Sequence, residues 1–362
     1  MTAAELPSTM LAAVLHGRDD LRLETVPVPS PGPGEVLLAV TACGVCGTDA
    51  AEWAHGPFQI PLESPHPVTG HSGPMVIGHE FAGRVVALGE GVGAEWLGRL
   101  VASAGAAACG HCELCLGGRS NVCRRYSVVG LHRDGALAAY ATAPLASCID
   151  VGALGIGELE AALVQPMAIA VHALRRGGVV AGDTAVVQGV GGVGAFLVHA
   201  LKQSGARVVA VDLDPGRLEA ARELGADVTV LGGQEDSARR ITQEFPAGLP
   251  VFFEVTGSDA GLQLALELVP VGSTVVLVGI AKAPRTLDMG RVTVRELTLV
   301  GTNGIVRETE LEPAAALVAS RAGRWSTIAP EPLPLAEVVT GALQPIAQGR
   351  PPAIKTLIRP TL

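Results

Sequence analysis

Four cysteines lie close together in one short polar stretch of the sequence. They follow the spacing C-x2-C-x2-C-x7-C. Four thiolates on one short lobe can form a closed tetrahedral shell around Zn²⁺, which leaves no position for a substrate. The alternative is a set of unpaired core thiols, but free cysteines rarely recur at such short intervals in a polar stretch. The pattern therefore predicts a structural zinc held by Cys109, Cys112, Cys115 and Cys123.

Residues that bind metals or move protons also occur in two other fragments, Gly44-Val-Cys-Gly-Thr-Asp49 and Gly78-His-Glu80. Taken alone, each has an ordinary explanation. A single histidine is more often a satisfied core residue than a ligand, and cysteine is among the most buried residue types. Thr48 and Asp49 are both of types that cap helix N-termini. Cys46 and His79 are nevertheless candidate ligands of a second metal site.

A glycine-rich hexamer, Gly189-Val-Gly-Gly-Val-Gly194, follows an apolar strand-like segment and opens a helix-like one. A structural turn is the common explanation of such a hexamer on its own. In this context the glycines permit close approach of a pyrophosphate to a helix N-terminus. Asp212 ends the next predicted strand, 23 positions after Gly189, where a carboxylate can bind ribose hydroxyls and repel a 2′-phosphate. NAD is therefore favoured over NADP. The expected binding residues are Gly189, Gly191, Gly192, Val193, Gly194 and Asp212.

The segments around these residues fall into two patterns. Up to about residue 158, short apolar strands are separated by Gly and Pro, which is typical of a β-rich domain. From about residue 159, strands alternate with helices, which predicts βαβ units and a parallel sheet covered on both faces. The predicted strands are 35–40, 83–88, 99–103, 184–188, 207–211, 251–255 and 274–279, and the predicted helices are 193–203, 217–224 and 259–268.

The alternation fades after about residue 305, and the last predicted strand, 354–358, resembles the first part of the chain again. The expected fold class is therefore α/β, with a doubly wound domain inserted between two pieces of a β-rich one. The expected boundaries are 1–158 and 306–362 for the β-rich domain and 159–305 for the dinucleotide-binding domain.

With these features, the sequence resembles the zinc-dependent medium-chain dehydrogenases, the relatives of alcohol and sorbitol dehydrogenase, along nearly its whole length. The fragments that carry the resemblance are Pro31-Gly-Pro-Gly-Glu-Val-Leu37, Cys43-Gly-Val-Cys-Gly-Thr-Asp49, Gly78-His-Glu-Phe-Ala-Gly83, Asp134-Gly135, 161–173 and Gly182-Asp-Thr184. The segments 56–61 and 66–70 are most similar to the loop of the (R,R)-butanediol dehydrogenase branch. The resemblance implies a GroES-like catalytic domain, a Rossmann domain, and NAD-linked interconversion of a secondary alcohol (diol, polyol or cyclic alcohol) and its ketone.

The resemblance also implies two zinc ions per subunit, one structural and one catalytic. Cys46 and His79 would hold the catalytic zinc, with Gln165 as the third ligand and water or substrate in the fourth position. Zinc lowers the pKa of a bound alcohol. Thr48 would accept and pass on the alcohol proton, and Asp49 would orient the His79 imidazole.

Two positions depart from the family pattern. Ala51 stands where many relatives carry a histidine that ends the proton relay. If residues 48–55 are helical, His55 lies one turn along the same face, although a surface histidine explains it equally well. Gln165 stands where the polyol and butanediol branches usually have Glu. Its carbonyl oxygen can ligate zinc, or the side chain packs as a neutral group. Glu80 can approach the metal when ligands exchange, so the third ligand is left open between these two residues.

Composition limits the remaining classes of function. The 26 basic and 35 acidic residues give a net charge of −9, which argues against nucleic acid or an anionic membrane as the main partner. No signal-peptide pattern or long apolar run occurs, so we expect a cytoplasmic protein without a membrane span. The strand 297–302 resembles the family's subunit-pairing edge, which predicts a homo-oligomer (a dimer or tetramer) that acts on a small alcohol or ketone. Alternatives are a biosynthetic reductase of a bulky ketone and a non-catalytic, zinc-stabilised protein that senses dinucleotides or scaffolds partners.

Overall fold

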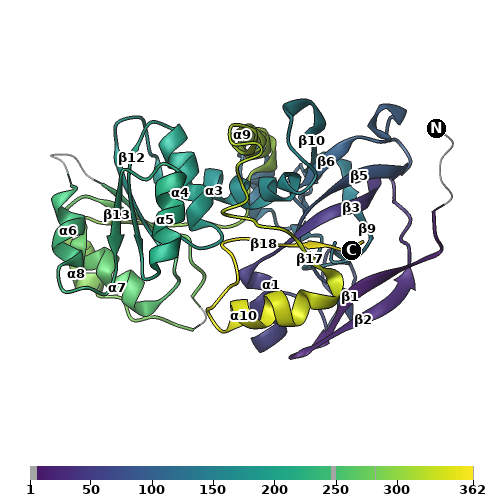
Figure 1. The fold of residues 1–362 in the computed structure, drawn as a ribbon, viewed down its shortest axis with the longest axis horizontal. Coiled ribbons are helices and arrows are strands. Elements are labelled where there is room, and N and C mark those ends of the chain that lie inside the picture. Colours follow the sequence, from purple (N-terminus) through teal and green to yellow (C-terminus); the bar gives the residue numbers. More distant parts are fainter. Residues whose placement is uncertain (1–5, 246–249, 282, 362) are drawn as a thin grey trace. The chain divides into compact units, whose positions relative to one another are not determined.

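The computed structural model describes residues 6–245, 250–281 and 283–361. The chain divides into two compact units, one formed by Met1–Gln165 together with Ile305–Leu362 and the other by Pro166–Gly304. The first unit is discontinuous in sequence, and the second is a continuous insertion (Figure 1). Each unit has its own sheets and its own hydrophobic core.

The main sheet of the first unit has the strand order β10-β6-β5-β3-β18-β17, and β9 also pairs with β3. Its strands are β3 (Glu35–Val45), β5 (Glu80–Leu88), β6 (Leu100–Ser103), β9 (Tyr140–Pro144), β10 (Cys148–Asp150), β17 (Leu333–Pro334) and β18 (Thr356–Arg359). Two smaller sheets are formed by β1 (Thr9–Gly17), β2 (Asp20–Pro27) and β4 (Met75–Val76), and by β7 (Ala106–Ala107) with β8 (Ser127–Val128).

Strand β3 is central to this sheet because it pairs with β5, β9 and β18. Its sequence is almost continuously apolar, and its last four residues are all buried, as expected for a strand that is covered on both faces. At this end Gly44 lies opposite Glu80 of β5, and Val45 lies opposite Thr356 of β18. The yellow β18 therefore runs beside the purple β3 in Figure 1. This register brings residues from three distant parts of the sequence to Cys46.

Helices of the first unit lie between and after these strands. The α-helices are α1 (Gly47–His55), α2 (Glu113–Leu116), α9 (Arg307–Ala319) and α10 (Gln344–Ala347). The short 3-10 or π-helical turns are η1 (Ala94–Trp96), η2 (Ser120–Val122), η3 (Leu145–Ser147), η4 (Gly152–Leu154), η5 (Glu160–Leu163), η6 (Leu335–Glu337) and η7 (Val338–Leu343). Helix α10 and the preceding η7 contact α1, so the C-terminal part of the chain supports the helix that begins at Cys46.

The second unit contains one six-stranded sheet with the order β13-β12-β11-β14-β15-β16, and every pair in it is parallel. Its strands are β11 (Thr184–Gln188), β12 (Arg207–Asp212), β13 (Val228–Leu231), β14 (Val251–Glu254), β15 (Thr274–Leu277) and β16 (Thr298–Gly301). The strand order is that of a doubly wound Rossmann fold, which reverses direction between β11 and β14.

Helices cover both faces of this parallel sheet (Figure 1). Helices α4 (Gly194–Gln203) and α5 (Pro215–Glu223) pack on one face, and α6 (Ser237–Gln243) and α7 (Asp259–Leu268) pack on the other. Helix α3 (Val164–Gly177) leads into the unit, and α8 (Met289–Val294) precedes β16. The α/β fold class predicted from the alternating pattern is confirmed.

Most predicted elements occur with small changes at their ends. Two were predicted with their observed bounds, β11 and α7, whereas the strand predicted at 274–279 ends at Leu277. The last strand lies at Thr356–Arg359 instead of 354–358. The elements that were not predicted include the strands β1, β2 and β13 and the helix α9.

Candidate metal centres and dinucleotide site

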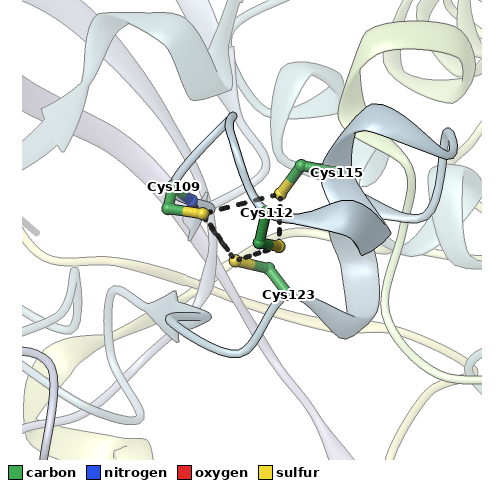
Figure 2. A group of neighbouring side chains, drawn as sticks. All are labelled: Cys109, Cys112, Cys115 and Cys123. Carbon is green, nitrogen blue, oxygen red and sulfur yellow. Dashed lines mark hydrogen bonds between the residues drawn. The ribbon is translucent and has the colours of Figure 1, made fainter.

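The four clustered cysteines converge on one point beside α2 (Figure 2). Their Sγ–Sγ distances are 3.5 Å for Cys112–Cys115 and Cys109–Cys123, 3.8 Å for Cys112–Cys123, and 4.0 Å for Cys109–Cys115. Four sulfurs at about 2.3 Å from a tetrahedral zinc lie about 3.8 Å apart. All seven cysteines lie within the described residues and all are free thiols. The observed spacing therefore fits a zinc ion with no open coordination position.

Two thiols of this cluster have pKa values that are shifted in opposite directions. The hydrogen bond from the Cys115 backbone N–H lowers the pKa of Cys112 to about 6. Desolvation and hydrogen bonds with neighbouring sulfurs raise the pKa of Cys115 to about 12. Like charges this close together oppose ionisation of the whole set. A divalent cation stabilises all four thiolates at once, so zinc binding would release protons from the cluster.

Helix α1 begins where β3 ends, and its first turn holds three of the predicted site residues. Cys46 is the N-cap residue, and its backbone N–H donates to Oδ2 of Asp49 at 2.8 Å. Asp49 therefore takes part in capping from the third helical position, as part of a capping box. Capping was the ordinary explanation considered for Thr48 and Asp49, and Asp49 does cap the helix, although the N-cap position itself is occupied by Cys46. The Thr48 hydroxyl lies 3.8 Å from the Cys46 sulfur.

The same Asp49 carboxylate orients His79. Asp49 is fully buried, and its Oδ1 lies 3.1 Å from Nδ1 of His79. A carboxylate at this position accepts a hydrogen bond, so Nδ1 carries the hydrogen and Nε2 is the nitrogen left for a metal. Burial lowers the pKa of His79, but the charge and hydrogen bond of Asp49 outweigh burial and hold that pKa well above its ordinary value. Ligand atoms of Cys46, His79 and Glu80 lie within 4.8 Å of one another.

Gln165 lies in the first turn of α3 and is 8% exposed. Its Oε1 atom is buried and has no hydrogen-bond partner among the described residues. Leaving a buried carbonyl oxygen unpaired costs about 1–3 kcal/mol. Coordination to a metal would satisfy this oxygen, whereas simple packing as a neutral side chain leaves it unsatisfied. The donor chemistry of Gln165 therefore fits a zinc ligand.

One buried charged residue next to this centre was missed by the sequence reasoning. Lys355 directly precedes β18, and its Nζ donates to both carboxylate oxygens of Glu80, at 2.7 Å and 3.0 Å. Both side chains are 3% exposed. Burial by itself lowers the pKa of Lys355, but the negative charges of Glu80 and Cys46 raise it above its ordinary value. A lysine beside a predicted strand gives no signal of burial, because most lysines are exposed.

The two positions considered for the proton relay both lie on α1. The expected helix is present at Gly47–His55, with Ala51 partly buried in its middle. His55 is exposed and is the last residue of the helix. Its placement fits the surface-histidine explanation.

The predicted glycine-rich loop connects β11 to α4 in the second unit. Gly189 has a φ of 97°, a backbone conformation that favours glycine. A Cβ added at Gly194 would collide with the Gly189 carbonyl oxygen, whereas space is open beside Gly191. Helix α4 begins at Gly194, so Gly191, Gly192 and Val193 lie at its N-terminus. This is the end of the sheet at which Rossmann folds hold a pyrophosphate.

Asp212 ends β12, as predicted, and contacts this loop. Its Oδ2 accepts a hydrogen bond from the Val190 backbone N–H at 2.7 Å, and its Oδ1 accepts one from the Asp214 N–H at 2.9 Å. Nη1 of Arg217 lies 3.7 Å from Oδ2 of Asp212. The sequence reasoning did not single out Arg217, because an arginine in an amphipathic helix gives no specific signal. A carboxylate and a guanidinium thus lie together where Rossmann folds bind the adenosine ribose.

Comparisons with known proteins agree with these features. Residues 32–153 match the family model of the alcohol dehydrogenase GroES-like domain, and residues 192–320 match that of the zinc-binding dehydrogenases. The (R,R)-butanediol dehydrogenase of Bacillus subtilis (strain 168) is 33% identical over 303 residues, which cover 82% of this chain and 84% of that protein. Sorbitol dehydrogenase of Homo sapiens is 33% identical over 306 residues, which cover 83% of each. The crystal structure of 2R,3R-butanediol dehydrogenase from Bacillus subtilis superimposes with a TM-score of 0.86 at 30% identity, covering 97% of this chain and 99% of that one.

A GroES-like domain, an inserted Rossmann domain and a four-thiol metal cluster define a class of zinc- and dinucleotide-dependent oxidoreductases. Within that class, the chain belongs to the family of zinc-dependent medium-chain dehydrogenases. The predictions of family, fold class and enzymatic function are confirmed. Its cofactors are zinc and a nicotinamide dinucleotide. Within the described residues, no helix is long and apolar enough to cross a membrane.

Proposed function

We propose that this enzyme interconverts a secondary alcohol, such as a diol, polyol or cyclic alcohol, with its ketone and uses NAD. The observation that carries the proposal is the donor set in the first unit: the Cys46 thiol, the Asp49-bound His79 and the orphaned carbonyl oxygen of Gln165. Three such ligands leave one position of a tetrahedral zinc for an alcohol oxygen. The named relatives, butanediol and sorbitol dehydrogenases, support the substrate class.

The residues around this centre have separate roles in the oxidation of the alcohol. Zinc held by Cys46, His79 and Gln165 would polarise the alcohol and lower its pKa. The Thr48 hydroxyl, which lies beside the Cys46 sulfur, accepts the alcohol proton and passes it towards solvent. A bound oxidised nicotinamide would supply the hydride acceptor, because it would take the hydrogen of the carbinol C–H bond together with the bonding electron pair. The products would be a ketone, the reduced dinucleotide and one proton.

The preference for NAD rests on Asp212. A ribose 2′-phosphate placed against its carboxylate would be repelled, whereas ribose hydroxyls can donate to it. The assigned cofactor residues are those of the loop and strand end: Gly189, Gly191, Gly192, Val193, Gly194 and Asp212. We assign the dinucleotide-binding domain to the continuous unit, residues 166–304, which begins seven residues later than the expected 159–305. The catalytic domain then comprises residues 1–165 and 305–362, where 1–158 and 306–362 were expected, and it holds Gln165 and the structural zinc at the four clustered cysteines.

The proposal also includes that the protein forms a homo-oligomer and is located in the cytoplasm. Among the described residues, strand β16 pairs only with β15, and the exposed apolar residue Val294 (78%) lies four positions before it, at the end of α8. An edge strand with an exposed apolar neighbour suits pairing with a second copy of the chain, as a dimer or tetramer. Free thiols in all seven cysteines support a reducing compartment such as the cytoplasm.

The experiment that tests the proposal is a screen of secondary alcohols and ketones with NAD(H) and NADP(H), followed by the absorbance of the reduced nicotinamide. We expect turnover of diols or polyols with NAD and the reverse reaction with the ketones. Cys46→Ala and His79→Ala should abolish turnover while NADH fluorescence still reports dinucleotide binding. Full activity in protein stripped of the catalytic zinc would refute the mechanism.

A further inference from the structure

Glu254 is a buried carboxylate of the second unit that belongs to neither metal centre nor to the glycine-rich loop. It is the last residue of β14 and is 2% exposed. In the parallel sheet it lies opposite Gln188 of β11 on one side and Leu277 of β15 on the other. It therefore stands at the carboxyl end of the sheet, beside the point between β11 and β14 where the strand order reverses. Dinucleotides bind across this point in Rossmann folds.

The Glu254 carboxylate binds the loop that follows it. Its Oε1 accepts the backbone N–H of Thr256 at 2.8 Å and also the Thr256 hydroxyl, and its Oε2 accepts the backbone N–H of Gly257 at 3.1 Å. Oγ1 of Thr256 in turn accepts the Ser258 N–H at 3.1 Å. Three successive backbone N–H groups are thus used within the loop. The backbone groups that residues 256–258 can offer to a ligand are therefore carbonyl oxygens.

This loop also packs against the glycine-rich loop. A Cβ added at Gly189 would lie 2.9 Å from Cγ2 of Thr256 and 3.3 Å from its backbone nitrogen, so Thr256 occupies the space that a side chain at position 189 would need. Gly189 begins the turn that is expected to hold the pyrophosphate. Asp212 ends β12, which lies on the other side of β11. The position of Thr256 therefore matters for the dinucleotide site on the side away from Asp212.

The loop after β15 depends on Glu254 as well. The backbone N–H groups of Val278 and Gly279 donate to the Glu254 carbonyl oxygen at 2.9 Å and 3.0 Å. A Cβ at Gly279 would collide with the Gly257 backbone, and a Cβ at Gly257 would lie 2.7 Å from the Ile280 carbonyl oxygen. The two loops are thus in direct backbone contact. One is held by the carboxylate of Glu254 and the other by its carbonyl oxygen and by this contact.

From this arrangement we infer that Glu254 is a positioning residue that holds the loops after β14 and β15 in the shape that receives the nicotinamide half of the dinucleotide. The adenosine half is assigned to the Asp212 side of the glycine-rich loop, and these two loops lie on the opposite side. The nicotinamide carboxamide and its ribose carry N–H and O–H donors, which suit a loop that offers carbonyl oxygens. The inference deepens the proposed function and rests on its dinucleotide site.

Calorimetric titrations of the zinc-loaded protein with NADH and with AMP test this role without turnover, because AMP contains only the adenosine half. In Glu254→Gln the side chain keeps its shape, but its NH2 group would face a backbone N–H that the carboxylate accepted. The dissociation constant for NADH should rise about tenfold, because the ligand must then order the loops as it binds. The affinity for AMP should stay unchanged. The fluorescence anisotropy of the bound reduced nicotinamide should fall, since its surroundings are less fixed.

Three further variants separate this role from a general effect on the fold. Thr256→Val keeps the side-chain shape but loses the hydroxyl that joins Glu254 to the Ser258 N–H, so it should weaken NADH binding and leave AMP binding unchanged. Thr256→Ser keeps the hydroxyl and should retain most of the NADH affinity. Glu244→Gln is the matched control, because it removes the charge of a carboxylate that pairs with Arg207 elsewhere in the same unit. It should leave both affinities unchanged.

Two results would overturn the inference. One is a wild-type affinity for NADH in folded Glu254→Gln, and the other is an equal loss of affinity for NADH and AMP, which a merely structural role would produce. If Glu254→Gln does not fold, the same two titrations of Thr256→Val decide the question. Failure of the proposed function would be visible separately, as a wild-type protein that binds NADH but turns over no secondary alcohol.

Discussion

Oδ1 of Asp49 lies 3.1 Å from Nδ1 of His79, and both side chains are buried. The other oxygen of the same carboxylate accepts the Cys46 backbone N–H at 2.8 Å. One side chain therefore positions both the thiolate and the imidazole that we assign to the catalytic zinc. Because the contact fixes the hydrogen on Nδ1, it also decides which ring nitrogen faces the metal.

Asp49→Asn is therefore expected to weaken this centre. The amide keeps the shape but loses the charge that holds the His79 hydrogen, so zinc affinity or kcat should fall by roughly 10- to 100-fold. Metal analysis after dialysis against a chelator and steady-state kinetics measure both effects. Glu52→Gln is the control, since Glu52 is buried on the same helix but accepts the Phe58 and Gln59 N–H groups. If the Asp49→Asn variant keeps its zinc and its kcat, the contact is not needed for the metal centre.

Gln165→Glu should change the charge of the catalytic centre from about +1 to about zero. A less positive centre holds an anion less well, so a bound alcohol should lose its proton only at higher pH. The acidic limb of the pH profile of alcohol oxidation should therefore move to higher pH, with the zinc content checked at each point. Gln165→Ala should instead lose the catalytic zinc. An unmoved profile in a fully metallated Gln165→Glu variant would mean that residue 165 is not a ligand.

Asp212→Ser should raise kcat/KM with NADP relative to NAD. The substitution removes a carboxylate that would repel the 2′-phosphate. In the wild type Arg217 lies 3.7 Å from this carboxylate, and without the carboxylate its guanidinium can bind the phosphate. Kinetics with both cofactors measure the ratio. Adding Arg217→Ala to Asp212→Ser should remove most of the gain. If the wild type already prefers NADP, the assignment of Asp212 is wrong.

Cys112→Ser should lower the bound zinc from two ions per subunit towards one and reduce the Tm. The Cys112 sulfur lies 3.5 Å from that of Cys115 and 3.8 Å from that of Cys123, so its loss opens a shell that otherwise closes around the ion. Zinc analysis and thermal unfolding measure both effects. Cys148→Ser, which changes a thiol outside the cluster, should leave the zinc content at two. Unaltered zinc and Tm in Cys112→Ser would exclude it as a ligand.

Stability should fall in acid partly because of His132. The His132 ring stacks on His66 with centroids 4.3 Å apart, and its Nδ1 accepts the Val128 N–H at 3.0 Å. Burial, and then the charge of His66, lower the pKa of His132 from its ordinary value of 6.5 to about 4. As the pH falls below about 6.5, the unfolded chain binds a proton that the folded chain refuses. The contribution of neutral His132 to the free energy of unfolding is therefore fully present above pH 6.5, and it is lost as the pH falls to about 4.

His132→Asn keeps an acceptor for the Val128 N–H but does not titrate in this range. The difference in unfolding free energy between wild type and His132→Asn should therefore shrink as the pH falls from 7 to about 4, as measured by denaturant unfolding at constant zinc. Parallel curves for wild type and His132→Asn would contradict the assignment.

The site residues that could be predicted from the sequence belong to short motifs. In these motifs the residue types and their spacing are enough to indicate the chemistry. The cysteine spacing, the glycine-rich loop and Asp212 at a strand end each depend on local geometry, and the structure places them as expected. Strand β11 was predicted with its observed bounds because parallel strands that are buried on both faces are continuously apolar.

Contacts between distant segments could not be predicted in this way. Lys355 and Glu80 are 275 positions apart, and they are brought together by the pairing of β3 with both β18 and β5. The strands β1 and β2 were missed because β1 is buried along most of its length and β2 is largely exposed, so neither has a clear two-residue alternation. Helix α9 was missed because Pro313 and a mixed polar sequence hide its helical period.

The insertion of one unit within the other has a consequence for the order of assembly during synthesis. Residues 166–304 form a continuous parallel-sheet unit, so they can fold as soon as they have left the ribosome. The other unit starts earlier in the sequence, but it cannot complete its main sheet at that stage. Its strand β3 lacks the neighbouring strand β18 until residues 356–359 have been translated. Pairings over such long loops form slowly. The nascent chain should therefore acquire the dinucleotide fold before the zinc centre is complete, which reverses the order in which the two units begin in the sequence.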